Sequence, residues 1–419
     1  MFKKSAMWFA AGALFVILMS HILRIPILIP LVTVVICAAL LLYDLKTATC
    51  LLFFFSPFSY ILSYSVYNLY IFLTVAYIVR VLLKKTHLYT IVFAVVLMLF
   101  CFTLTDQEVG FKIGYLIYPI LLLTVMFVCE NTKPEWYRSV IHCLMLGFIL
   151  SACIGFFKEQ IPSIVKLFDE NPLFIEGVEE TMDIERFSGI SYDPNFFTLL
   201  DCLLIAYLLF SNQKLSAPKL IALTFLVVVG FFTFSKSYLL LLLAMVLLYV
   251  FRNGRNVGKK LMAVVGVAVV FLIVEFALDL ELMKLISARF STTDGVNDLT
   301  TGRTDIWLKY LEHIFTDIKR FFVGEGYNAL ALGKAAHNTY IDMLYRFGFV
   351  GVGIWMAYFI YSYKIVPQEQ PQERQSKIPF WVMMIAVAFL STFHFQQLWC
   401  CICVTIFTLR MPKEEVCQS

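Results

Sequence analysis

Long, nearly uncharged apolar runs recur along the chain and are separated by short polar breaks. The runs lack the alternation of a membrane β-barrel strand, and backbone groups in lipid need partners within their own segment. We therefore expect membrane-spanning helices, about fourteen of them. Their expected limits are 5–22, 26–43, 48–62, 66–83, 89–105, 111–129, 139–157, 195–210, 218–233, 237–251, 261–279, 347–364, 379–392 and 396–410.

Composition gives the same picture. Hydrophobic residues make up 61% of the chain and charged residues 15%, whereas soluble domains are about 45–50% apolar. A net charge of +4 gives no reason to expect a nucleic-acid partner. Cys400, Cys401 and Cys403 cluster within one apolar run, where we expect them to serve helix packing, and we expect neither disulfides nor bound metal.

The distribution of positive charge predicts the orientation. Lys3 and Lys4 precede the first run, which we interpret as a retained span, since no signal-peptide cleavage site follows it. Lys and Arg then concentrate in alternate breaks, which predicts that both termini lie in the cytoplasm. The break at 158–194 faces the other compartment and carries nine acidic residues against three basic ones.

This topology divides the chain into five parts. We expect N-terminal membrane helices, an acidic extracytoplasmic loop, central membrane helices, a large extracytoplasmic loop, and C-terminal membrane helices with a cytoplasmic tail. The corresponding residues are 1–157, 158–194, 195–279, 280–346 and 347–419.

An amphipathic helix is expected within the large loop, from Arg303 to Phe322, with Thr301 as its N-cap and Gly324 as its terminator. Its apolar side would lie on the outer membrane surface or pack as a lid on the bundle. The apolar positions are Trp307, Tyr310, Leu311, Ile314, Phe315, Ile318, Phe321 and Phe322, and the opposite side holds Lys309, Glu312, Lys319 and Arg320.

Three basic positions face the same compartment. Arg186 opens the segment RFSGISYDPN, in which Asp193 and Pro194 suit the cap and first residue of a helix. Lys236 lies in a short hairpin, and Arg303 begins the large-loop helix. The structural alternatives are an Arg–acid pair for Arg186 and an interface anchor for Lys236.

Further polar residues follow or accompany these. His337 suits a general base near neutral pH, and Asn338 adjoins it. Asp342 and Arg346 share a helical face with Asn338, and we expect them to form a structural ion pair. Asp201 lies inside a span, where a carboxylate needs a partner; Lys236 is the nearest candidate.

These motifs resemble the bacterial O-antigen ligase and O-antigen polymerase (Wzy-type) superfamily over residues 186–355. The matching positions, in order, are Arg186, Gly189 and Asn195, then Ser235–Lys236–Ser237, Gly302, Arg303 and Trp307, Gly324 and Gly326, and finally His337, Asn338, Tyr340, Gly348 and Gly351. The family usually has arginine where this chain has Lys236, which lacks the bidentate fork for phosphate.

The resemblance implies an all-α, GT-C-like membrane bundle with metal-independent, inverting glycosyltransferase activity and no cofactor. The implied donor is an undecaprenyl-pyrophosphate-linked glycan, used with a glycan acceptor at the outer face and with a chain-length regulator as a further partner. Arg186, Lys236 and Arg303 would bind the pyrophosphate, His337 would deprotonate the acceptor, and Asn338 and Asn195 would contact substrate.

The sequence leaves the reaction open. A polymerase extends lipid-linked chains with repeat units for O-antigen, capsule or exopolysaccharide, and a ligase transfers the finished glycan to lipid A core or protein. A flippase would be expected to show internal repeats and charges along a central path, and a non-enzymatic scaffold gives no reason for the basic cluster. Polymerase is our preferred interpretation.

Overall fold

A computed structural model of the chain describes residues 4–65, 67–83, 113–129, 134–169, 186–191, 193–210, 216–251, 257–278, 303–325, 336–365, 377–390 and 396–410. The chain is mostly helical. Its helices are α1 (Lys4–Leu23), α2 (Leu28–Leu42), α3 (Leu45–Phe55), α4 (Tyr70–Leu82), α6 (Ile113–Cys129), α7 (Pro134–Gly155), α8 (Pro162–Asp169), α9 (Pro194–Phe210), α10 (Ala217–Phe231), α11 (Lys236–Phe251), α12 (Val257–Leu278), α15 (Arg303–Phe315), α16 (Ile318–Val323), α17 (Thr339–Ile365), α18 (Ile378–Val387) and α19 (Gln396–Arg410). Two 3-10 turns, η1 (Ser56–Phe58) and η2 (Lys158–Gln160), and one antiparallel hairpin of β1 (Ser63–Tyr64) and β2 (Tyr67–Asn68) complete the described elements.

The helical class is confirmed, but the count of fourteen spans is not. Among the described residues, three helices are long and apolar enough to cross a membrane: Lys4–Leu23, Trp136–Gly155 and Thr339–Tyr361. Eight further apolar helices there have 10–17 residues, which is shorter than the roughly 20 residues that a 30 Å hydrocarbon layer takes. The expected span at 89–105 lies outside the described residues.

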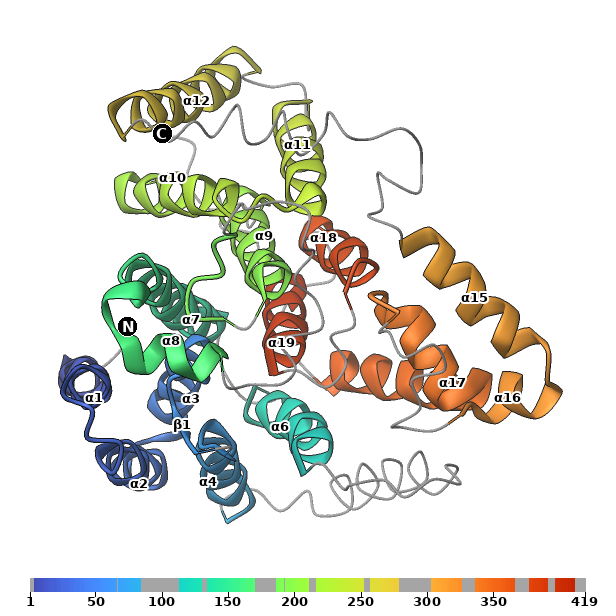
Figure 1. Ribbon diagram of the computed structural model, residues 1–419, viewed down its shortest axis with the longest axis horizontal. Helices are drawn as coiled ribbons and strands as arrows, with labels where there is room; N and C mark the ends of the chain where they lie inside the picture. Colours follow the sequence, from blue (N-terminus) through green and yellow to red (C-terminus); the bar gives the residue numbers. More distant parts are fainter. Residues whose placement is uncertain are drawn as a thin grey trace.

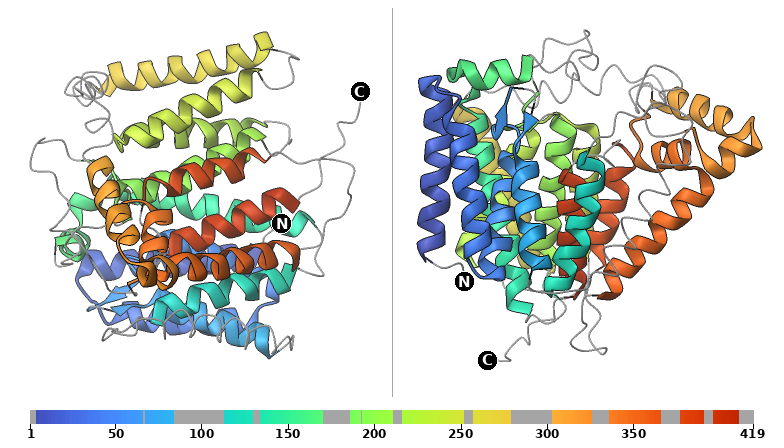
Figure 2. Two further views of the ribbon diagram at one scale, coloured as in Figure 1. Left: turned by 90° about the vertical axis from the view of Figure 1, so that its right-hand side faces the viewer. Right: turned by 90° about the horizontal axis from the view of Figure 1, so that it is seen from below.

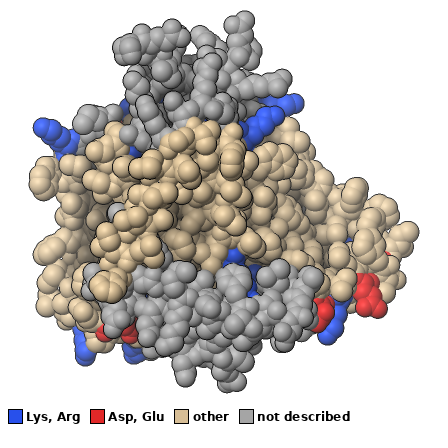
Figure 3. Space-filling model, turned by 90° about the horizontal axis from the view of Figure 1, so that it is seen from above, with Lys and Arg blue, Asp and Glu red and all other residues tan. Residues whose placement is uncertain are grey.

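The helices lie side by side, with α9 inside the bundle (Figure 1). Helix α9 packs against α10, α11, α18 and α19, so segments from the middle and the end of the chain share one interior. Figure 2 shows that α1 begins at one end of the bundle, while α8, the β-hairpin, α15 and α16 lie toward the other end. Charged side chains gather at the edges of the face in Figure 3, and a broad uncharged band lies between them.

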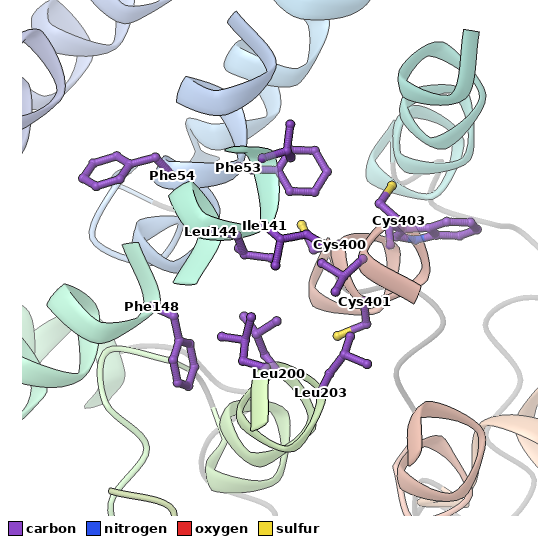
Figure 4. Packing of buried hydrophobic residues seen from close by; sticks show 14 of the residues in the cluster. Phe53, Phe54, Ile141, Leu144, Phe148, Leu200, Leu203, Cys400, Cys401 and Cys403 are labelled. Atoms are coloured by element: carbon purple, nitrogen blue, oxygen red, sulfur yellow. The ribbon is translucent and has the colours of Figure 1, made fainter. Parts of the chain in front are cut away.

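The interior is a large apolar core. Phe53 of α3, Leu144 of α7 and Leu203 of α9 meet there beside the cysteines of α19 (Figure 4). Cys400, Cys401 and Cys403 are all buried, and Cys400 Sγ lies 3.0 Å from the Ser56 hydroxyl. These cysteines therefore pack between helices, as small polarizable side chains do.

The large-loop helix differs from its prediction. The chain forms two helices, α15 and α16, with a break at Thr316–Asp317. Asp317 accepts a hydrogen bond at 2.8 Å from the Lys319 amide, so its side chain caps a new helix start. The C-cap at Gly324, with φ of 82°, agrees with the expected terminator. Thr301, the expected N-cap, lies outside the described residues.

The other long loop, the acidic segment 158–194, contains the two short helical elements η2 and α8.

Helix α17 is interrupted at Gly348, where φ is 62° and ψ is −175°. The backbone of Gly348 lies against Phe322 and Val323 of α16, and that of Gly324 lies against Arg346 and Gly348. Side chains at both glycines would overlap backbone atoms, which is why this close crossing needs glycine. The helix after the break corresponds to the span expected from residue 347.

We predict that Gly348→Ala destabilises the protein while Gly353→Ala in the same helix does not. At Gly348 the new methyl group would require a left-handed backbone and a displaced α16, a cost of about 1–3 kcal/mol. At Gly353 no neighbouring atom lies within 4 Å of the place that a Cβ would take, and alanine favours helix there. Thermal unfolding in detergent measures both, and equal melting temperatures for the two variants would contradict the assignment.

Candidate functional site

The first two sequence motifs meet in one hydrogen-bonded cluster. Arg186 donates from Nε to the Thr233 carbonyl at 3.0 Å and from an Nη to Asn195 Oδ1 at 3.1 Å. The Ser235 hydroxyl donates to the same Asn195 oxygen at 3.2 Å. Asn195 therefore joins the segment that enters α9 to the connection between α10 and α11.

The local backbone explains this arrangement. Gly189 has φ of 61°, and its backbone lies so close to that of Gly155 in α7 that a side chain at position 155 would overlap it. Asp193 accepts a hydrogen bond from the Asn195 amide at 2.5 Å, and α9 begins at Pro194. The predicted cap and first helical residue are thus confirmed. The segment before α9 therefore follows a defined path into the helix. Arg186 lies in this segment and is half-buried.

Lys236 is the first residue of α11 and follows Ser235 directly. Its half-buried position adds a cation to the start of a helix, where the backbone dipole is already positive. The neighbouring Ser235 and Ser237 hydroxyls lie 2.9 Å apart. Arg186 and Lys236 thus bring two positive charges to one small region.

Asp201 does not form the expected ion pair with Lys236. It is fully buried on α9, and neither of its carboxylate oxygens has a hydrogen-bond partner among the described residues. A buried ionised carboxylate without a partner is costly. The sequence reasoning assumed that the nearest cation along the bundle would reach it.

The third motif is fixed to the turn that follows α18. Arg303 donates from Nη1 to the Phe389 carbonyl at 2.9 Å, and the Thr339 hydroxyl donates to the next carbonyl, that of Leu390. Trp307 of α15 donates to the Ala336 carbonyl at 2.8 Å, just before His337. The beginning of α15 and the beginning of α17 are therefore held together against α18.

His337 and Asn338 occupy this junction. His337 is half-buried and has φ of 49°, a left-handed conformation that is uncommon outside glycine, asparagine and aspartate. Asn338 Oδ1 accepts hydrogen bonds from the amides of Tyr340 and Ile341, at 3.0 and 3.2 Å, and so caps α17. The cap directs the chain so that His337 lies immediately outside the helix.

Asp342 and Arg346 form the predicted ion pair, with Nε and Oδ1 2.8 Å apart. Asp342 is buried and adds to the rise in pKa of Tyr310, which burial brings to about 12. Glu325, for which the sequence indicated no role, contacts Arg320 and lies 3.3 Å from His313 Nε2. These contacts stabilise the region of α15, α16 and α17.

The two groups of residues lie toward one end of the bundle and are linked through α18, which packs against both α9 and α11. Sequence reasoning missed Thr233 and Thr339 as positioning residues, since a threonine near a helix end carries no distinctive signal. Gly302 and Gly326, which belong to the expected site, lie outside the described residues. Within the described part of the chain no three His, Cys, Asp or Glu residues group as metal ligands would.

Comparison of this chain with protein-family profiles, with curated proteins and with solved structures finds no match. The geometry of the site and the resemblance of its motifs therefore carry the functional argument.

We predict that Asn195→Ala destabilises the protein and Asn195→Asp does so less. Alanine removes the oxygen that accepts from both Arg186 and Ser235, and the loss of two hydrogen bonds, one of them from a charged group, costs roughly 1–3 kcal/mol. Aspartate keeps an acceptor at that position. Thermal unfolding in detergent is the measurement, and an Asn195→Ala protein as stable as wild type would show that the bridge contributes nothing.

Proposed function

We propose that this protein is a membrane glycosyltransferase that polymerises undecaprenyl-pyrophosphate-linked oligosaccharide repeat units at the outer face of the bacterial inner membrane. The observation that carries the proposal is the bridge from Arg186 through Asn195 to Ser235, which joins two distant motifs beside Lys236. Cations fixed in this way suit a diphosphate leaving group, because arginine and lysine bind phosphate oxygens through charge-assisted hydrogen bonds.

Each proposed role follows from chemistry at the site. The bond from the anomeric carbon to the pyrophosphate breaks, and negative charge develops on the departing oxygen. Arg186, Lys236 and Arg303 stabilise that charge. His337 takes the proton from the acceptor hydroxyl, whose oxygen forms the new glycosidic bond with inversion at the anomeric carbon. The products are the extended glycan and free undecaprenyl pyrophosphate.

Several of the proposed binding residues also use side-chain atoms to contact other protein groups, which holds the site in place. Asn195 and Asn338 direct their side-chain oxygens to protein groups, so we propose that they orient Arg186 and His337 in addition to any contact with substrate. Arg303 likewise donates one hydrogen bond to the Phe389 carbonyl. Positioning of this kind keeps the cations in place before the charge develops, which is how preorganised sites lower a barrier.

We predict that His337→Ala and His337→Asn both abolish chain extension at normal protein levels in the membrane. General-base catalysis contributes about 10²–10⁴-fold to a rate, so a loss of at least roughly 100-fold is expected. Asparagine tolerates the left-handed backbone of position 337, and it separates lost chemistry from lost conformation. The readout is glycan chain length with purified lipid-linked donor.

The control is His313→Ala, which removes another histidine of the same loop region. His313 contacts Glu325 and lies outside the proposed catalytic group, so this variant should extend chains normally. Full activity of His337→Asn would exclude His337 as the base, and activity restored by asparagine but not alanine would indicate a backbone role.

Polymerase and ligase share the donor and differ in what accumulates when the protein is missing. Lipid-linked glycans from a deletion strain are expected to contain single repeat units only. Long chains remaining on the lipid carrier would indicate a ligase. Translocation of labelled lipid-linked glycan by proteoliposomes without formation of a glycosidic bond would indicate a flippase.

A further inference from the structure

The region of α15 and α16 exposes a set of large apolar side chains toward solvent. Helix α15 has three sides: Tyr310 and Ile314 are buried against α17, Lys309 and Glu312 are exposed, and a third side carries exposed apolar residues. The exposed apolar set continues into α16 and the first part of α17 after its break. Its members, between 44% and 77% exposed, are Leu308, Phe315, Ile318, Phe322 and Phe349.

This set, which we call the apolar corner, is continuous with a candidate membrane-spanning helix. Phe321 of α16 stacks on Phe349, with ring centroids 5.8 Å apart and an interplanar angle of 12°. Phe349 is the first residue after the break at Gly348. The exposed apolar surface then runs on along α17 through Val350, Met356 and Ile360.

The contact at Gly324 and Gly348 fixes the depth of the apolar corner. Helix α16 crosses α17 where the latter resumes after its break, so α16 lies level with the outer end of that half of α17. If α17 crosses a membrane from this point, Ile318 and Phe322 lie at the boundary between headgroups and acyl chains. Exposed Lys309 and Lys319 are then near enough to contact lipid phosphates.

We infer that the apolar corner inserts into the outer leaflet of the same membrane that α17 crosses, as an interfacial anchor. Interfacial helices place an apolar side about 5–10 Å into the headgroup and acyl boundary and keep a charged side in water. In Figure 3 the visible charges of the lobe on the right lie mostly along its lower edge, and most of the rest of the face in view is uncharged. The anchor holds α15 and the start of α17, and with them Arg303 and His337, at a set height above the bilayer.

This inference does not depend on the reaction catalysed, and lipid quenching tests it directly. The full chain carrying Ile318→Cys is labelled with an environment-sensitive fluorophore in phosphatidylglycerol–phosphatidylethanolamine nanodiscs that hold one copy each. Glu312→Cys, on the charged side of α15, is the matched control. The parent chain, which has eleven cysteines, is labelled in parallel and its signal subtracted.

Spin-labelled phospholipid should quench the fluorophore at position 318 several-fold more than at position 312, and aqueous iodide should show the reverse. Phe315→Cys should behave like Ile318→Cys, which guards against a local effect of one substitution. Equal iodide quenching at 318 and 312 would overturn the proposal. Protection of position 318 from both quenchers would also overturn it, because a protein surface would then cover the apolar corner.

Discussion

Two backbone carbonyls in the turn that follows α18, those of Phe389 and Leu390, constrain much of the site. A backbone carbonyl removed from water costs free energy unless it accepts a hydrogen bond. Arg303 supplies a donor to Phe389, and Thr339 supplies one to Leu390. Because these residues begin α15 and α17, the two hydrogen bonds also fix two segments of the large loop on the bundle.

The same helix connects the two parts of the proposed site. Helix α18 packs against α9 and α11, and the cluster of Arg186, Asn195 and Ser235 lies where the chain enters these two helices. The two groups are therefore coupled through one short helix, even though they are far apart in sequence. Each arginine uses part of its guanidinium to bind protein oxygens. Under the proposed function, these contacts would hold the positive charge in place before negative charge develops on the leaving group.

What the sequence could predict depended on how local each interaction is. The start of α9 at Asp193–Pro194 and the Asp342–Arg346 pair involve residues no more than four apart, and both are confirmed. The contact of Arg303 with Phe389 spans 86 positions, and no local pattern encodes it. The break at Asp317 was missed because the apolar period continues across it, although an aspartate before Ile318 is itself a capping signal.

Lys236 lies where the superfamily that these motifs resemble usually has arginine, and the geometry suggests how the proposed site could use a lysine there. A lysine lacks the forked donors that grip a phosphate in two places. Arg186 already places a guanidinium, with its forked donors, at the connection between α10 and α11, where it contacts Thr233. Lys236 adds a point charge at the positive end of α11. Under the proposed function, Arg186 orients the pyrophosphate and Lys236 adds positive potential.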